Sequence, residues 1–167
     1  QIVLGHVGIF KALVFEARLN AEAESQLFEA VQRKAYGEID LLLDCKVQDS
    51  ALKQQFKELT RLSGDESVLA RAQKAFADAS AAVTAELKDL NDIVHGVNRR
   101  LGELDLHFDL CELRGYEYHT GIVFAAYINE YCRAVAKGGR YDQLGKAFGR
   151  ARPASGFDTV LKVLAPL

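Results

Sequence analysis

The chain has 167 residues and a formal net charge of −2, so it can bury one sizeable core but offers no long-range attraction for nucleic acid. Hydrophobic residues at 49% and charged residues at 26% are ordinary for a globular protein and exclude a disordered or fibrous chain. No apolar run approaches the roughly 20 residues that span a bilayer. The three cysteines lack close pairing, which favours reduced thiols in a soluble, cytoplasmic protein.

The first predicted elements are a strand and a helix. Gln1–Gly5 is a short apolar strand, and His6–Phe10 forms a glycine-containing turn into a helix that runs to about Arg18. His6 can be read as a ligand group, but a turn residue at the end of the strand is the favoured interpretation. The chain contains no methionine and opens within a predicted strand, so we expect a piece of a longer protein.

From 21 to 102 the sequence is predicted to be helical almost throughout. Asn20 stands at the N-cap of the first helix, Ala21–Lys34, whose Leu27 and Val31 recur at helical spacing. The remaining segments are expected in this order: a break at Tyr36-Gly37, an apolar turn at Ile39–Leu43, a helix capped by Asp49-Ser50 that runs to Leu62, a stop at Ser63–Asp65, and helices over Glu66–Ala79 and Ser80–Leu101. We expect their apolar stripes to serve packing and their interleaved charges to face solvent.

After Gly102 the pattern changes from helical to strand-like. Leu104–Leu110 alternates apolar and polar residues with a period of two, as in a half-buried strand. The segments expected after it are strands over Tyr116–Tyr127 and Tyr131–Ala136, a turn at Gly138–Asp142 into a helix through about Phe148, and a segment Pro153–Asp158 that leads into a helix over Thr159–Leu164. Short connections between the strands indicate an α+β fold in which an antiparallel sheet is flanked by helices.

Hydrogen-bonding side chains gather in the stretch 114–121, at the start of a predicted strand. Arg114 offers a planar fork for a carboxylate, and Glu117 can pair with an amine. Tyr118 and His119 each offer a ring for stacking and a polar group. A cluster of this kind predicts a pocket for a small polar ligand.

Three stretches resemble, in their order and spacing, the C-terminal half of the histidyl-tRNA synthetase catalytic core: Arg114–Gly121, Gly138–Asp142 and Pro153–Phe157. In that family the first stretch is the histidine-binding signature, and the last begins the third class II motif. The resemblance implies part of a class II aminoacyl-tRNA synthetase-like core with a helical insertion. It divides the chain into a strand and helix of the core at 1–20, the helical insertion at 21–102, and the sheet with the histidine pocket at 103–167.

The resemblance implies a histidine-like ligand pocket formed by Arg114, Tyr118, His119 and Tyr141, with no catalytic residue, metal ion or cofactor. Arg114 would neutralise the carboxylate of the ligand. Tyr118 and His119 match a pair of tyrosines that contact the imidazole side of histidine, although His119 departs from the second tyrosine. Tyr141 matches an aromatic ring near the pocket.

The third stretch departs from the pattern of a working synthetase. There, the segment after its Gly-Phe pair supplies a glycine against which ATP lies and an arginine that contacts the nucleotide. Val160 and Val163 stand at the matching positions. Loss of the guanidinium removes a charge-assisted contact worth about 1.5–3 kcal/mol, and a β-branched valine obstructs close approach, so we expect adenylate formation to be lost. For Arg140 and Asp142 we expect an ion pair that fixes a turn rather than a ligand contact.

The regulatory subunits of short-form ATP phosphoribosyltransferase, a branch of the same fold that lacks aminoacylation, resemble the chain more closely. Gly5–Phe10, Tyr118–Gly121 and Phe148–Ala154 carry this likeness. It implies a non-catalytic subunit of histidine biosynthesis that supports the catalytic subunit of ATP phosphoribosyltransferase and its feedback control by L-histidine, as a homodimer within a hetero-oligomer. The alternatives are a histidyl-tRNA synthetase fragment that activates histidine with ATP, and a structural scaffold with a vestigial pocket.

Overall fold

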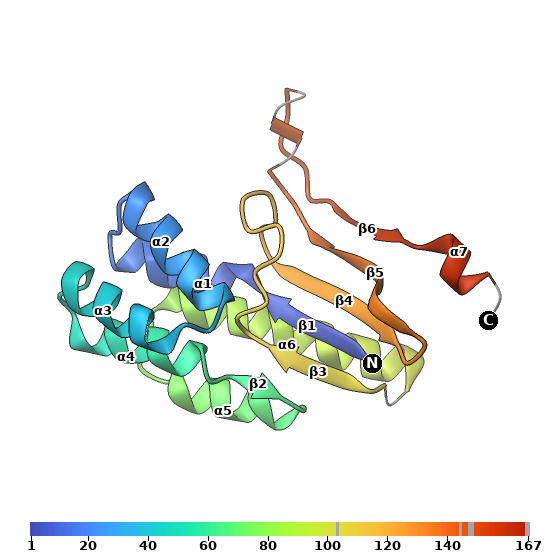
Figure 1. Cartoon of the computed structure of the whole chain (residues 1–167), viewed down its shortest axis with the longest axis horizontal. Coiled ribbons are helices and arrows are strands. Elements are labelled where there is room, and N and C mark those ends of the chain that lie inside the picture. Colours follow the sequence, from blue (N-terminus) through green and yellow to red (C-terminus); the bar gives the residue numbers. More distant parts are fainter. Residues whose placement is uncertain (103, 144, 147–148, 166–167) are drawn as a thin grey trace.

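A computed structural model describes residues 1–102, 104–143, 145–146 and 149–165. The strands of its central sheet are β1 (Ile2–His6), β2 (Ser63–Gly64), β3 (Leu106–Asp109), β4 (Ile122–Ile128), β5 (Tyr131–Arg140) and β6 (Ser155–Thr159). They lie in the order β2-β3-β1-β4-β5-β6 (Figure 1). β1 runs parallel to β3, and the other neighbouring strands pair antiparallel. The predicted fold class is confirmed, and the parallel pairing is an addition to it.

Most helices occupy one end of the sheet and one of its faces, whereas α7 follows β6 at the opposite end (Figure 1). Those that the structure describes are α1 (Val7–Glu16), α2 (Ala21–Gln32), α3 (Tyr36–Lys46), α4 (Ser50–Leu59), α5 (Ser67–Ala75), α6 (Ala81–Leu101) and α7 (Leu161–Leu164). α6 runs behind β1 and β3, whereas α2 to α5 cluster beyond one end of the sheet. None of these described helices is both long enough and apolar enough for a bilayer crossing.

β1 lies in the middle of the sheet and continues directly into α1. The glycine-containing turn predicted for His6–Phe10 is therefore wrong, because the helix begins at Val7. The Val7 N–H donates to the carbonyl oxygen of Gly121 at 3.1 Å, which holds the start of the helix against the start of β4. A β-carbon at Gly8 would meet the carboxylate of Glu86 in α6, so this flexible side chain would have to move to admit a larger residue.

Predicted N-caps account for where several helices begin. The side-chain oxygen of Asn20 accepts the Ala23 N–H at 2.9 Å, and the Asp49 carboxylate accepts the Ala51 N–H at 2.7 Å. Ser80, predicted only as the first residue of the last long helix, is the N-cap of α6. The predicted starts of α2, α4 and α6 are thereby confirmed.

Two predicted interruptions of the helical region belong to helices instead. Tyr36 and Gly37 open α3, which also contains the predicted apolar turn Ile39–Leu43. The break lies earlier, at Lys34, where φ is 51° just after α2.

Ser63–Gly64, predicted as a stop, is strand β2 and pairs with β3. A strand of two residues has no periodicity of its own, so only its distant partner reveals it.

Two strand boundaries near the C-terminus are also corrected. Residues 116–121 form a loop before β4 instead of the first half of a strand. β5 continues through Arg140 instead of turning at Gly138. A β-carbon at Gly138 would collide with the carbonyl oxygen of Gly156 in β6, so this glycine serves the close approach of two strands rather than a turn.

β6 replaces the predicted approach to the last helix. Ser155–Thr159 pairs antiparallel with β5, and the helix predicted from Thr159 shortens to Leu161–Leu164. Of the helix predicted to follow Asp142, residues 145–146 are 3₁₀-helical, whereas residue 143 lies in a turn. The remainder of that prediction, at 144 and 147–148, lies outside the described residues.

The hydrophobic core lies between the sheet, α1 and α6 and extends into the cluster of α2 to α5. The stripe predicted on α6 is buried at Val83, Leu87, Leu90 and Val94. Other fully buried large side chains come from the helices and from β3: Phe10, Phe56, Phe76, Leu13, Leu43 and Phe108. Because the core binds α6 to one face of the sheet, the opposite face of β4 and β5 is free to carry a site (Figure 1).

Candidate functional site

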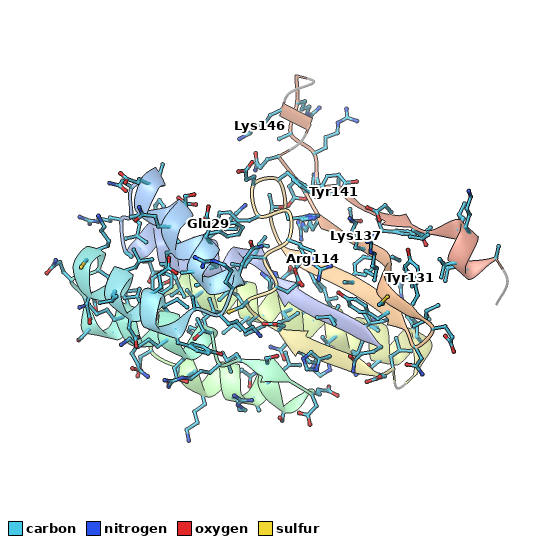
Figure 2. The ribbon with its side chains drawn as sticks, viewed as in Figure 1. Glu29, Arg114, Tyr131, Lys137, Tyr141 and Lys146 are labelled. Atoms are coloured by element: carbon cyan, nitrogen blue, oxygen red, sulfur yellow. The ribbon has the colours of Figure 1, made fainter. Side chains whose placement is uncertain are left out.

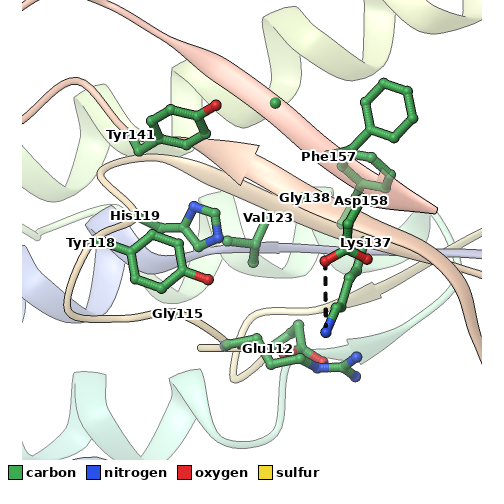
Figure 3. A pocket seen from close by; sticks show the side chains of 13 residues that line it. Glu112, Gly115, Tyr118, His119, Val123, Lys137, Gly138, Tyr141, Phe157 and Asp158 are labelled. Atoms are coloured by element: carbon green, nitrogen blue, oxygen red, sulfur yellow. Dashed lines mark hydrogen bonds and ion pairs between the residues drawn. The ribbon is translucent and has the colours of Figure 1, made fainter. Parts of the chain in front are cut away.

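A cavity of about 480 Å³ opens where β4, β5 and β6 face the loop that precedes β4 (Figure 2). All four predicted pocket residues line it: Arg114, Tyr118, His119 and Tyr141. Figure 3 shows the aromatic end of the cavity, with Tyr118, His119 and Tyr141, and apart from it the charged end, with Glu112, Lys137 and Asp158. The structure thus brings the predicted residues together, and their contact with a ligand stays a prediction.

Gly115 shapes the loop that presents the aromatic residues. Its φ is 64°, a left-handed conformation that favours glycine, and its carbonyl oxygen accepts the N–H groups of Tyr118 at 3.0 Å and His119 at 2.8 Å. A β-carbon at Gly115 would come within 2.5 Å of His119 Cδ2 and 2.6 Å of Tyr118 Cζ. The glycine is therefore required both for the turn and for the packing of two rings against it.

His119 is the buried centre of the aromatic end, with only 6% of its surface exposed. Its ring centroid lies 4.4 Å from that of Tyr118 and 6.2 Å from that of Tyr141. Burial lowers the pKa of His119, and the charge of Lys11 acts in the same direction, while the hydrogen bond to the Arg140 carbonyl oxygen opposes them. The imidazole is therefore neutral at pH 7 and can stack on a planar ligand without repelling a cation.

Lys11 of α1 holds the loop that precedes β4 in place, a role that the sequence did not reveal. Its Nζ donates to the carbonyl oxygen of His119 at 2.6 Å and lies 4.8 Å above the ring of Tyr116. The Tyr116 hydroxyl in turn donates to Glu24 of α2 at 2.5 Å. The loop is thereby fixed to α1 and α2 as well as to the sheet.

Arg114 already has a carboxylate partner within the chain. Its Nε and Nη2 donate to the two carboxylate oxygens of Glu112 at 3.0 and 2.8 Å, and Nη2 also donates to the Tyr127 hydroxyl at 2.9 Å. Burial alone would lower the pKa of Arg114, but these hydrogen bonds outweigh it and raise the pKa. Glu112 therefore occupies the Nε and Nη2 donors of the guanidinium, while the Arg114 side chain stays 48% exposed and its contact with a ligand carboxylate stays a prediction.

Two further charged residues in the cavity, Lys137 and Asp158, were not predicted. They face each other across the β5–β6 pair, with Nζ and Oδ2 3.8 Å apart. Only knowledge that Ser155–Thr159 is a strand in register with β5 brings them together. Glu112 had a local signal, because it stands two residues before Arg114, but its pairing depends on the loop conformation.

Several expectations concern residues just outside the cavity. The predicted ion pair between Arg140 and Asp142 is confirmed, with Nε and Oδ2 2.9 Å apart. Glu117 is exposed and does not line the cavity. Val160 and Val163 also lie outside its lining, in the segment that forms α7, where the Val160 N–H donates to the Val135 carbonyl oxygen at 2.8 Å.

His6 lies at the end of β1, as favoured, but fully buried rather than in a turn. Its Nε2 is 3.3 Å from Asp89 and its Nδ1 is 3.6 Å from Glu86, both in α6. Within the residues that the structure describes, no group of three His, Cys, Asp or Glu side chains is close enough together to hold a metal ion. His6 thus joins the first strand to the long helix.

The fold agrees with comparisons to known proteins. The family model described as histidyl-tRNA synthetase matches residues 1–164, and the chain belongs to this family. A solved ATP phosphoribosyltransferase regulatory subunit/histidyl-tRNA synthetase from Bacillus halodurans shares the fold, with a TM-score of 0.83, 23% identity, and coverage of 99% of this chain and 43% of that chain. Histidyl-tRNA synthetase from Nostoc sp. PCC 7120 also matches, with a TM-score of 0.73, 21% identity, and coverage of 99% and 41%.

Within this family, the curated relatives carry a more particular name. The ATP phosphoribosyltransferase regulatory subunit of Chromohalobacter salexigens is 50% identical over 167 residues, which is 100% of this chain and 42% of that protein. The protein of the same name from Azotobacter vinelandii is 48% identical over 164 residues, 98% of this chain and 41% of that protein. The chain therefore spans about two fifths of the length of these relatives, and the likeness to regulatory subunits is confirmed.

Proposed function

We propose that this protein is a non-catalytic regulatory subunit of ATP phosphoribosyltransferase that supports the activity of the catalytic subunit and its feedback control by L-histidine. The observation that carries the proposal is the 50% identity, over all 167 residues, to a relative of that name. A solved ATP phosphoribosyl transferase complex from Thermotoga maritima has the same fold, with a TM-score of 0.65 at 18% identity over 95% of this chain and 53% of that chain. The protein would act in the cytoplasm as a homodimer within a hetero-oligomer.

The cavity supports the histidine part of the proposal. A volume of about 480 Å³ is in the range of small-molecule sites and exceeds what one amino acid needs. Tyr118, His119 and Tyr141 would form the walls around the imidazole, with Arg114 at the other end. These four residues are proposed as the pocket that 103–167 contributes, with 21–102 as a helical insertion in the synthetase-like core.

Histidine bound here can regulate a partner only through a difference in affinity between the active and inactive states of the complex. The loop that carries His119 is connected to α1 through the hydrogen bond from Lys11. An occupied cavity would therefore favour one position of this loop against α1. The proposed feedback requires that this position differ between the two states of the assembly.

A histidyl-tRNA synthetase fragment is the second candidate, because the family model that matches the chain carries that description. Activation of histidine requires ATP beside the amino acid. The positions proposed for the nucleotide-contacting glycine and arginine are Val160 and Val163, and neither lines the cavity. This arrangement favours binding of an amino acid without activation.

Reconstitution tests the proposed function. The full natural chain, tagged and co-expressed with the catalytic phosphoribosyltransferase subunit from the same organism, should co-purify with it. The purified complex should transfer phosphoribosyl groups faster than the catalytic subunit alone, and L-histidine should reduce that rate. A catalytic subunit that neither associates with the chain nor changes its rate would overturn the proposal.

A further inference from the structure

A second cavity, of about 250 Å³, lies between α6 and the neighbouring ends of β4 and β5. None of its lining residues that the structure describes also lines the larger cavity. Its polar wall comes from three places along the chain: Glu86 and Asp89 of α6, Thr120 and Gly121 just before β4, and Arg140 and Asp142 at the end of β5.

The charges in this second cavity do not balance. The Nε of Arg140 donates to both carboxylate oxygens of Asp142, at 3.1 and 2.9 Å, so these two side chains neutralise each other. Glu86 and Asp89 remain, one turn apart on α6 and only 35% and 37% exposed. Among the described residues, the only Lys or Arg within 4.0 Å of either carboxylate is Arg140, at 4.0 Å from Asp89. Two half-buried carboxylates therefore lack a cation of their own.

His6 gives a second, independent sign that a donor belongs here. Its Nε2 lies 3.3 Å from Asp89 Oδ2, and because an ionised carboxylate can only accept, Nε2 carries the hydrogen of the neutral ring. Burial lowers the pKa of His6, so the ring is neutral at pH 7 and Nδ1 has a free lone pair. Nδ1 is buried, has no hydrogen-bond partner among the described residues, and faces Glu86 Oε2 at 3.6 Å. Two acceptors thus face each other with no hydrogen between them.

A group that supplies both hydrogens and positive charge resolves this arrangement. Burial raises the pKa of Glu86, and the charge of Asp89 acts in the same direction, against that of Arg140. A proton on Glu86 would fill the gap to Nδ1 but leave Asp89 without compensation. A primary ammonium group brings three N–H donors and one positive charge, so it can serve both carboxylates at once. No three metal-ligating side chains are grouped among the described residues, so an N–H donor suits the site better than a metal ion.

The wall opposite α6 is held in place without a ligand. The Thr120 N–H donates to the Arg140 carbonyl oxygen at 2.8 Å, and the Thr120 hydroxyl accepts the Asp142 N–H at 3.0 Å. The Asp142 carboxylate also accepts the Ala154 N–H at 3.3 Å. The cavity is therefore formed in advance, which lowers the cost of ordering it when a ligand binds.

The geometry points to a second ligand site: the cavity between α6 and the ends of β4 and β5 binds a primary alkylammonium group, with Glu86 and Asp89 as its ionic partners and His6 Nδ1 as a further acceptor. A volume of about 250 Å³ holds a short alkyl chain in addition to the ammonium group. The site is separate from the pocket proposed for L-histidine, and the inference does not rest on the proposed function.

Thermal unfolding of the full natural chain in propylammonium chloride and in tetramethylammonium chloride at equal concentrations tests the site. The two cations carry the same charge, but tetramethylammonium has no N–H group. The melting temperature should rise with the concentration of propylammonium, and by more than with tetramethylammonium, because a ligand that binds only the folded state stabilises it.

Substitutions on α6 identify the residues involved. Glu86→Gln should weaken propylammonium binding by about 10–100-fold and remove the difference between the two salts. Its side-chain amide can donate to His6 Nδ1, so we expect this variant to stay folded. Asp89→Asn should weaken binding in the same way. Asp92→Asn, at an exposed carboxylate of α6 outside the cavity lining, is the matched control and should preserve the difference.

Two results would overturn the inference. One is an unsubstituted protein that propylammonium stabilises no more than tetramethylammonium does. The other is a folded Glu86→Gln protein that still distinguishes the two salts. Where the site is present, association with the catalytic subunit separates two sources of the ammonium group: weaker association of Glu86→Gln assigns it to a lysine side chain of that partner, and equal association assigns it to a free amine.

Discussion

At the scale of single residues, Arg114, in the stretch that resembles a histidine-binding signature, pairs with Glu112 of the same loop. The sequence identified Arg114 as a residue that meets a carboxylate, and it does so, but the carboxylate belongs to the chain itself. A one-dimensional pattern shows which side chain can neutralise a charge and cannot show which charge lies nearest. The partner of Arg114 is therefore found only when the conformation of its loop is known.

Substitution of Glu112 tests this structural role. Glu112→Ala leaves the Arg114 guanidinium without its bidentate partner, so the free energy of unfolding should fall by about 1–3 kcal/mol. Glu117→Ala, an exposed carboxylate of the same loop, is the matched control and should change it by about 0.5 kcal/mol or less. Urea unfolding followed by circular dichroism measures both. Equal stability of the two variants would show that the pair is not structural.

At the scale of elements, capping signals placed the helices well, and the sheet was predicted less completely. Asn20 and Asp49 form the caps that were expected, because a cap depends only on residues two or three positions away. β2 and β6 depend on partners far along the chain, and the paired glycines 138–139 have the composition of a turn although they lie in β5. Local chemistry therefore predicts helix starts, whereas strand pairing over long sequence separation escapes it.

The cap of α2 gives a prediction at this scale. Asn20→Ala removes the side-chain oxygen that accepts the Ala23 N–H, and the free energy of unfolding should fall by about 0.5–2 kcal/mol. Gln26→Ala, at an exposed position within the same helix, should be neutral or slightly stabilising because alanine has the higher helix propensity. Thermal unfolding of the two variants measures the difference. An Asn20→Ala protein as stable as Gln26→Ala would show that the cap does not stabilise the helix.

At the scale of the whole molecule, His6 links the first strand, α1 and α6, and predicts how stability depends on pH. Burial lowers the pKa of His6 below its ordinary value of 6.5, with the charge of Arg140 acting in the same direction and the hydrogen bond and charge of Asp89 opposing them. The unfolded chain therefore binds a proton at His6 more readily than the folded chain. Stability should fall as the pH drops from about 6.5 toward the folded-state pKa.

Comparison with His6→Gln isolates this contribution. The natural protein should be the more stable of the two at neutral pH, and its advantage should shrink as the pH falls below about 6.5. Glu86, whose pKa is raised by burial and by Asp89, is present in both proteins, so its own titration largely cancels from the difference. Urea unfolding across this range gives the result, and an advantage that stays constant with pH would contradict the assigned pKa direction.

The same whole-molecule view unites the fold with the proposed function. A synthetase-like sheet presents a cavity of about 480 Å³ with a charged end and an aromatic end. Val160 and Val163 stand where the resemblance places the groups that contact a nucleotide, and both are aliphatic. The central claim is therefore that the chain binds an amino acid without activating it.

Histidine-dependent exchange of labelled pyrophosphate into ATP tests this claim most directly. The assay uses the full natural chain at a saturating concentration of L-histidine, with an active histidyl-tRNA synthetase as the positive control. We predict exchange no faster than in the absence of the protein. Exchange that rises with L-histidine concentration and requires the chain would contradict the account.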